Sequence, residues 1–169
     1  MRDAAHVTHA LEGIRPKALE VLLAFIYEGE CRIDEGQLND VLEASDRLAV
    51  DDLKAACAHV IGEQLAPSNA LNVWRLADVF TLPVLEKAAV EAALRGFEEL
   101  PAAQATGAEV VALVQEDRLV ARSEEAVFQW VKRWWEAGAR AEAELLAVLR
   151  HDTHASYQRA AFSKKIEEA

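Results

Sequence analysis

Two pairs of histidines have a spacing that suits metal ligands. His6 and His9 form one H-x-x-H sequence, and His151 and His154 form a second. On a helix this spacing can place two imidazoles on one face, and two such pairs could together hold a metal ion. Neither pair has a cysteine or an acidic residue at the spacing of a third ligand. We therefore interpret all four as surface histidines and predict no metal site.

Residues for covalent or acid–base catalysis are present, but they do not form a recognisable pattern. No serine lies in a nucleophile-elbow sequence, and no glycine-rich phosphate loop occurs. Cys57 falls on the apolar side of an expected helix, where a thiol usually packs. The acidic pairs Glu98-Glu99 and Asp51-Asp52 suit exposed or capping positions. We predict no catalytic residues and no cofactor, and we expect that the protein is not an enzyme.

The tryptophans were the remaining candidates for a ligand site. A cage of these rings is one interpretation, but tryptophans more often anchor cores and interfaces. Trp130 and Trp134 share one helical stripe, which favours a place in the core. Trp74 and Trp135 each lie beside such a stripe. We interpret these two as contacts with another element or with a partner.

Composition sets limits on the class of protein. The chain has 169 residues, 52% of them hydrophobic, enough for one domain or two small ones. A formal net charge of −11 disfavours binding to nucleic acid or to anionic membranes. The longest apolar run, Val21 to Ile26, is too short to span a bilayer, and no signal peptide is recognisable. With Cys31 and Cys57 as the two cysteines, we expect free thiols and a cytoplasmic location, with the nucleus left open.

The first third of the chain reads mainly as helices. Pro16 suits a helix start, and Gly29 suits a position just past a helix end. Two more helices are expected at about 35–48 and 52–64. Short strands are weakly indicated at 7–11 and 31–33. The predicted buried face of the first helix consists of Leu19, Leu22, Leu23 and Ile26.

The stretch 65–78 reads as a joint between two helical units. Pro67 fits just before a helix, and Ser68 and Asn69 are good N-cap types. The helix that follows has an apolar face with the spacing i, i+3, i+4 and i+7. Its members are Val73, Leu76, Ala77 and Phe80.

The rest of the chain is an almost unbroken series of expected helices. A helix rich in small residues follows Pro83, and a flexible connector is expected at 101–107. Ser123 suits an N-cap, and the helix after it should bury one apolar stripe and stop at Gly138. That stripe consists of Val127, Trp130, Val131 and Trp134. A further helix is marked at 145–149, and residues 151–169 should form a frayed or surface helix.

One combination of motifs is more specific than a series of helices. Residues 18–30 resemble the helix and turn near the middle of BTB domains, with the sequence Phe25-Ile26-Tyr27-Glu28-Gly29. Segments 41–48 and 53–57 look like the two BTB helices that follow. The stretch 65–78, with Trp74-Arg75-Leu76-Ala77-Asp78, resembles the junction between the BTB and BACK domains of kelch-like proteins. Segments 123–131 and 145–150 are similar to later BACK helices.

The resemblance implies a mainly α fold over about residues 7–150. Residues 1–65 would be the C-terminal half of a BTB-like domain, a helical remnant with at most one or two short strands. Residues 66–150 would form an all-α BACK helical array, and residues 151–169 a divergent C-terminal helix or tail. The first half of the BTB domain and the kelch propeller do not appear in the match. We therefore expect a fragment or a truncated product.

Members of this family serve as substrate adaptors of cullin-RING ubiquitin ligases. The resemblance implies a protein–protein interaction module whose partner is a cullin, of the cullin-three type. Met1 and Asp3 would stand where the family has a hydrophobic residue, any residue and glutamate. Tyr27 would lie beside the cullin-contacting surface, and an exposed Trp74 would be a second anchor, within the segment 70–80 that extends the contact.

A second hypothesis keeps the fold and changes the partner. The chain would then be a scaffold or assembly module that binds other BTB–BACK chains or regulatory proteins, outside the ubiquitin system. A truncated chain of this kind could also compete with a full-length relative. Binding to a cullin separates the two hypotheses.

Overall fold

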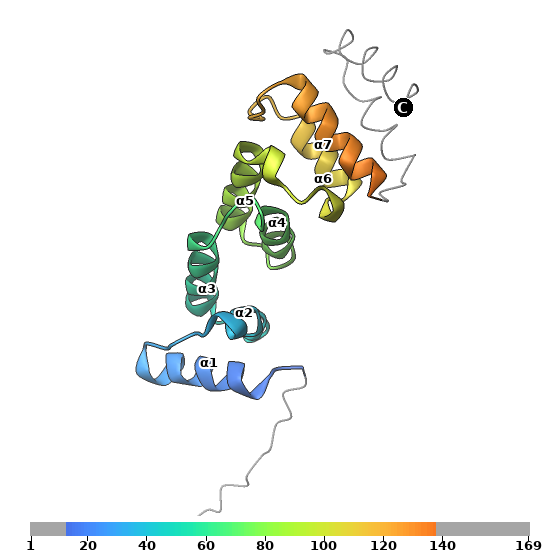
Figure 1. Ribbon diagram of the computed structural model, residues 1–169. Coiled ribbons are helices and arrows are strands. Elements are labelled where there is room, and N and C mark those ends of the chain that lie inside the picture. Colours follow the sequence, from blue (N-terminus) through green and yellow to red (C-terminus); the bar gives the residue numbers. More distant parts are fainter. Residues whose placement is uncertain (1–12, 138–169) are drawn as a thin grey trace, which may run out of the picture. The chain divides into compact units, whose positions relative to one another are not determined.

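The computed structural model describes residues 13–137, which contain seven α-helices, three short 3₁₀ helices and no strand (Figure 1). The mainly α fold expected from the sequence is confirmed. Contacts divide the chain into two compact units, Met1–Glu63 and Gln64–Ala169. Several predicted features lie outside the described residues: the four histidines of the H-x-x-H pairs, Met1, Asp3, Gly138, the strand at 7–11, the helix at 145–149 and the C-terminal segment 151–169.

Unit 1 is built from three α-helices and one 3₁₀ turn. They are α1 (Pro16–Glu28), η1 (Glu35–Gln37), α2 (Leu38–Arg47) and α3 (Asp51–Glu63). Pro16 occupies the first position of α1, where its missing N–H costs no hydrogen bond. Gly29 ends the helix with a φ of 78°, a left-handed conformation that glycine adopts without strain. Both predicted boundaries of α1 are confirmed.

The core of unit 1 gathers where α2 packs against α1 and α3. Its buried apolar side chains recur at helical spacing, so each helix contributes one face. They are Ala18, Leu22, Leu38, Val41, Leu42, Ala44, Leu53, Cys57 and Ile61. Ser45 is also buried, and its hydroxyl donates a hydrogen bond to the Leu42 carbonyl at 2.8 Å.

The predicted strand at 31–33 is wrong. Residues 30–34 form an irregular connection between α1 and η1. A strand needs a neighbouring strand to receive its backbone hydrogen bonds, and none exists in the described part of the chain. The short apolar alternation of Cys31 and Ile33 therefore reflects partial burial of two side chains.

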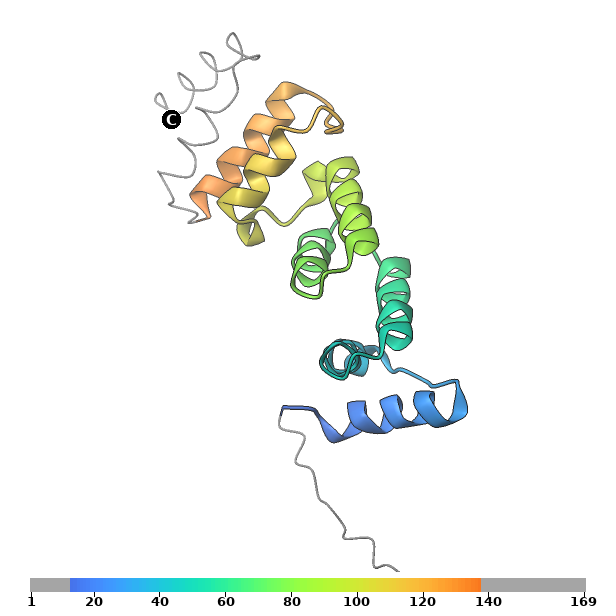
Figure 2. The ribbon, with the colours of Figure 1, turned by 180° about the vertical axis from the view of Figure 1, so that it is seen from behind.

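The described part of unit 2 begins with a helical hairpin and continues through two further α-helices (Figure 2). Its elements are α4 (Ala70–Val79), α5 (Pro83–Arg95), η2 (Phe97–Glu99), η3 (Ala102–Gln104), α6 (Gly107–Val114) and α7 (Glu124–Glu136). α4 and α5 pack along each other, and α7 packs on η2 and η3. Ser123 is the N-cap of α7, and its side-chain oxygen accepts from Ala126 N–H at 3.2 Å, as predicted.

The start of α4 differs from the expected cap. Asn69 occupies the N-cap position, but its side chain makes no bond to the first turn of the helix. Instead, its Oδ1 accepts from Ala66 N–H at 2.8 Å, and its Nδ2 donates to the Gln64 carbonyl at 2.9 Å. The side chain thus fixes the chain that leads into the helix. Asparagine favours this kind of local backbone bond.

The core of unit 2 is larger and more aromatic than that of unit 1. Trp130 and Trp134 are fully buried, as predicted, and the Phe97 ring lies 4.5 Å from that of Trp130. Aliphatic residues from four α-helices and from the segments between them surround these rings. They are Ala70, Leu71, Ala93, Leu94, Leu100, Ala105, Val110, Leu113 and Val131.

The expected flexible connector at 101–107 is packed and hydrogen-bonded. Trp130 Nε1 donates to the Leu100 carbonyl at 3.1 Å, and Trp134 Nε1 donates to the Ala105 carbonyl at 2.9 Å. Between them lies η3, and Ala105 is buried. Alanine, glutamine and threonine make this segment look like a linker, but two indoles from α7 bond the carbonyl group just before it and one within it. The prediction of a flexible connector is therefore wrong.

Two helices of this fold end in a left-handed residue that is not glycine. Ala49 follows α2 with a φ of 54°, and Thr81 follows α4 with a φ of 53°. In the second case, Leu82 N–H donates to the Ala77 carbonyl and Thr81 N–H to the Asp78 carbonyl. This is the Schellman pattern, in which glycine is the favoured residue. A β-branched side chain is especially strained in that conformation.

We predict that Thr81→Gly stabilises unit 2 by about 1 kcal/mol, because the cost of left-handed threonine exceeds the added freedom of the unfolded glycine. Urea unfolding followed by tryptophan fluorescence measures this, since the sequence places all four tryptophans in unit 2. Thr81→Ala keeps a Cβ at the same position and serves as the control, with a smaller gain. A lower unfolding midpoint for the glycine variant would contradict the assignment of strain.

Candidate functional site

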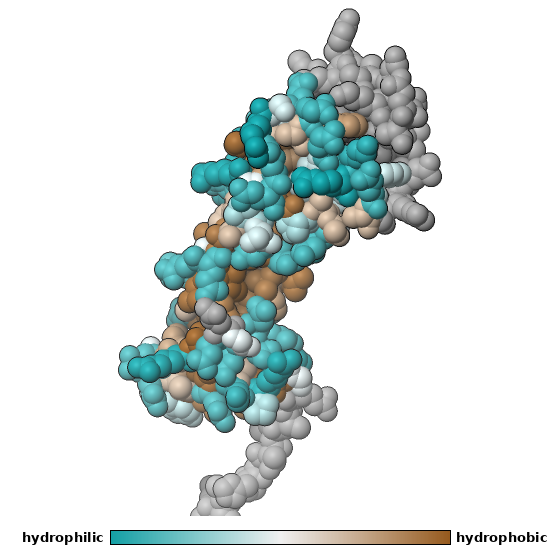
Figure 3. Space-filling model, viewed as in Figure 1, coloured by the Kyte–Doolittle hydropathy of each residue, from teal (hydrophilic) through white to brown (hydrophobic). Residues whose placement is uncertain are grey.

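The outer side of α1 exposes large hydrophobic side chains. Leu23 is 42% exposed, Ile26 is 54% exposed and Tyr27 is 83% exposed. Their positions i, i+3 and i+4 place them together on one surface of the helix. Hydrophilic residues cover most of the face of the molecule drawn in Figure 3, and hydrophobic ones appear in limited patches. We call Leu23, Ile26 and Tyr27 the α1 patch.

The position of the α1 patch corrects one sequence prediction. Leu23 and Ile26 were expected on the buried face with Leu22, but only Leu22 among these three is buried. α1 is apolar over a wide arc, and its contacts with α2 cover only the side that carries Ala18 and Leu22. Periodicity alone does not show which part of such an arc meets the core.

Trp74 lies on α4 and is half-buried. Its ring packs against the core of unit 2, as does that of Trp135, whose centroid lies 6.5 Å from that of Trp134. The sequence predicted that Trp74 and Trp135 contact either another element or a partner, and the contact with other elements is confirmed. A role for Trp74 in binding a partner stays a prediction.

Arg75, the neighbour of Trp74, joins α4 to α6 through a two-pronged ion pair. Its Nε lies 2.6 Å from Glu109 Oε1, and its second guanidinium nitrogen lies 2.7 Å from Oε2. The guanidinium also donates to the Gln104 carbonyl. Glu109 in turn accepts from Thr106 N–H at 2.8 Å and forms a capping box with that residue. Paired geometry of this kind gives strong, orienting hydrogen bonds.

The environment of Glu109 sets its protonation. Burial raises the pKa of Glu109. The hydrogen bond and positive charge of Arg75, together with the hydrogen bonds from Thr106, outweigh burial and hold this pKa below its ordinary value. The carboxylate therefore stays ionised at neutral pH. This group is a structural connection between α4 and α6, because its carboxylate bonds both Arg75 on α4 and the N-cap of its own helix.

We predict that unit 2 loses stability in acid partly through Glu109. The contribution of a group with a lowered folded pKa is present above the ordinary value of 4.5, and it disappears as pH falls through the folded pKa. Glu109→Gln should therefore be less stable at neutral pH, and the difference should shrink below about pH 4. Urea midpoints of both proteins across this range, read by tryptophan fluorescence, measure it. Parallel pH profiles would contradict the prediction.

Cys57 is buried in the core of unit 1, in agreement with its predicted packing role. Burial, with a smaller contribution from Cys31, raises the pKa of the Cys57 thiol to about 11. Burial also raises the pKa of Cys31. Neither thiol has the lowered pKa of a reactive nucleophile.

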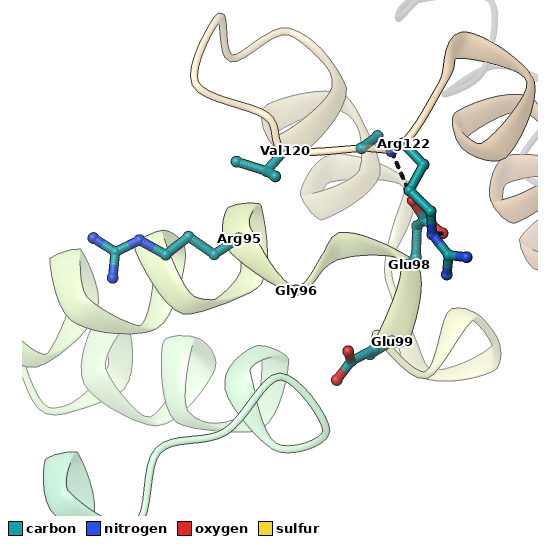
Figure 4. Close-up of a pocket in the computed structure, with 7 residues that line it drawn as sticks. Arg95, Gly96, Glu98, Glu99, Val120 and Arg122 are labelled. Atoms are coloured by element: carbon teal, nitrogen blue, oxygen red, sulfur yellow. Dashed lines mark hydrogen bonds and ion pairs between the residues drawn. The ribbon is translucent and has the colours of Figure 1, made fainter.

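A shallow hollow of about 180 Å³ lies between the end of α5 and the loop before α7 (Figure 4). Arg122 forms an ion pair with Glu98 at 2.9 Å, and Arg122 N–H also donates to that carboxylate. Arg95 points away from Arg122 and pairs with Glu91. Since these charged groups do not converge on one point, the hollow offers no arrangement for catalysis.

Residues 13–137 contain neither a metal-binding cluster nor a membrane-spanning helix. No group of three or more histidine, cysteine, aspartate or glutamate side chains there could hold a metal ion. No helix in the same range is long and apolar enough to cross a membrane. Among the described residues the α1 patch is the leading candidate site, because exposed apolar side chains grouped on one helix surface are typical of contacts with other proteins.

Comparison with known families agrees with the sequence resemblance. The BTB/POZ domain model matches residues 1–65, and the BACK model (BTB And C-terminal Kelch) matches residues 70–153. The chain belongs to the BTB–BACK family. The α1 patch lies within the BTB match, and Trp74 and Arg75 lie within the BACK match.

Kelch-like proteins are among the relatives of this BTB–BACK chain. Human Kelch-like protein 38 is 34% identical over 157 residues, which cover 88% of this chain and 27% of the relative. Human Kelch-like protein 24 is 30% identical over 137 residues, which cover 79% of this chain and 23% of the relative. The chain thus spans about a quarter of the length of these relatives.

The sequence alone identified part of the candidate site. Tyr27 is exposed at the end of α1, and its place beside a cullin-contacting surface stays a prediction; Met1 and Asp3 lie outside the described residues. Leu23 and Ile26 were missed because they were assigned to the core. The sequence did contain a signal for their exposure. Leu23, Ile26 and Tyr27 have the spacing i, i+3, i+4, so they form an apolar surface of their own next to the buried Leu22.

Proposed function

We propose that this BTB–BACK chain is a protein-interaction adaptor for a cullin-RING ubiquitin ligase, with a cullin of the cullin-three type as its partner. Such an adaptor works by placement. It holds a bound protein close to a ubiquitin-loaded enzyme, which raises the effective concentration of the reacting groups. The adaptor itself performs no catalysis in this proposal.

The observation that carries the proposal is the α1 patch. An exposed tyrosine beside two exposed aliphatic side chains, within the region that matches the BTB model, supports a protein-binding surface. Aromatic residues with this exposure are frequent energetic anchors in interfaces. The pairing of Arg75 with Glu109 further supports an adaptor, because it ties α4, which carries Trp74, to α6.

We predict that Tyr27→Ala weakens binding to the cullin amino-terminal domain by about tenfold or more, the usual effect of truncating an interface anchor. The side chain is 83% exposed, so its removal should leave folding unchanged. Isothermal titration calorimetry with both purified proteins measures the affinity, and circular dichroism checks the fold. Val120→Ala removes an exposed apolar side chain from unit 2 and is the matched control.

The outcomes separate the two hypotheses from the sequence. No binding of the folded wild-type chain at micromolar concentrations would contradict the cullin proposal and favour a BTB–BACK scaffold or a competitor of a longer relative. Binding that Tyr27→Ala does not change would remove the α1 patch from the interface.

A further inference from the structure

The charges along α1 run opposite to those that stabilise a helix. Helix dipoles favour acidic side chains in the first turn and basic ones in the last turn. α1 has no acid in its first turn and no base in its last turn; Lys17 lies near its start and Glu28 ends it. In α2, α5 and α7 the order is the favourable one, with an acid first and a base last.

The acidic groups of α1 and of the turn that follows it have no charged partner in the described part of the chain. Glu20, Glu28 and Glu30 are exposed, and none of them takes part in an ion pair with a residue of 13–137. Arg15 is occupied by Asp40, at 2.9 Å. Lys17 lies eleven residues before Glu28, about 17 Å away along the helix.

These carboxylates border the α1 patch. Glu20 precedes Leu23 by three residues and Tyr27 by seven, so all three share one surface of the helix. Glu28 follows Tyr27 directly, and Glu30 comes just after the left-handed turn at Gly29. The surface therefore combines apolar side chains with negative charge at the negative end of the helix dipole.

We propose that the α1 patch binds a basic amphipathic helix of its partner. Apolar side chains of that helix would cover Leu23, Ile26 and Tyr27, and its lysine or arginine side chains would face Glu28 and Glu30. This inference rests on the proposed function, because it names the chemistry of the surface that the partner presents. An acidic partner would be repelled, and a neutral one would leave the carboxylates desolvated without compensation.

The test is a double variant that removes the two charges, Glu28→Gln with Glu30→Gln. Affinity for the cullin amino-terminal domain should fall about tenfold, while the thermal midpoint of the free chain should rise, since the unfavourable charge at the helix end is gone. Glu99→Gln with Asp117→Asn is the matched control, because both double variants remove two negative charges from the net charge of −11. The control should leave affinity unchanged.

Salt gives a second readout. Raising the ionic strength from about 50 to about 500 mM should lower the affinity of the wild type for the cullin domain more than that of the Glu28 and Glu30 double variant. One result overturns the inference: the wild type binds the cullin domain, Tyr27→Ala weakens this binding, and the double variant keeps the affinity and salt dependence of the wild type. A fall of both affinity and stability in the double variant would also overturn it. No binding by wild type would instead contradict the proposed function itself.

Discussion

Trp130→Ala should destabilise unit 2 by about 4 kcal/mol, the usual cost of truncating a fully buried aromatic side chain. The Trp130 ring is completely buried against Phe97, at a centroid distance of 4.5 Å. Its removal also leaves the Leu100 carbonyl without the indole donor. Urea unfolding followed by the fluorescence of the other tryptophans measures the loss.

Two further variants divide this cost between packing and hydrogen bonding. Trp130→Phe keeps an aromatic ring and removes the Nε1 donor, and it should cost clearly less than the alanine variant. Trp135→Ala removes a ring that is only half-buried and should cost less than Trp130→Ala as well. Equal losses for Trp130→Ala and Trp135→Ala would contradict the arrangement of the unit 2 core.

Gly96→Ala should destabilise unit 2 by about 3 kcal/mol, at the upper end of the usual cost of overpacking. Gly96 has a φ of −105°, which any residue can adopt, so the requirement for glycine is one of space. A Cβ at this position would overlap Cγ of Pro67 and lie 2.5 Å from its Cβ. The proline ring is rigid and cannot move aside as a flexible side chain could.

A second substitution tests the cause. In a Pro67→Gly background both obstructing carbon atoms are absent, so Gly96→Ala should cost much less than it does alone. Gly36→Ala is the control, because nothing lies within 4 Å of a Cβ added there. Urea midpoints from tryptophan fluorescence and circular dichroism give the comparison. A cost for Gly96→Ala that Pro67→Gly leaves unchanged would exclude the predicted clash.

Local signals in the sequence predicted most of the helices. Pro16 and Gly29 marked the two ends of α1, and Ser123 marked the start of α7, because caps depend on residues within one turn. The segment at 101–107 was misjudged for the opposite reason. The carbonyl groups of Leu100, just before it, and of Ala105, within it, accept hydrogen bonds from Trp130 and Trp134, about thirty residues further along the chain.

The candidate site was predictable in one part and not in another. Tyr27 followed from the family motif, and its exposure agrees with a place at an interface. The exposure of Leu23 and Ile26 depended on which side of α1 meets α2, and no local rule contains that information. The reversed charges of Lys17 and Glu28 were visible in the sequence, and comparison with the helix dipole would have revealed them.

The packed segment at 101–107 has a practical consequence for dividing this protein. A protease that prefers loops should cut there slowly, because Leu100 and Ala105 are buried and their carbonyl groups are bonded to α7. An expression boundary placed at this segment would separate the α4–α5 hairpin from the tryptophans that complete its core. The smallest fragment of unit 2 worth expressing should therefore extend from before Pro67 at least through α7.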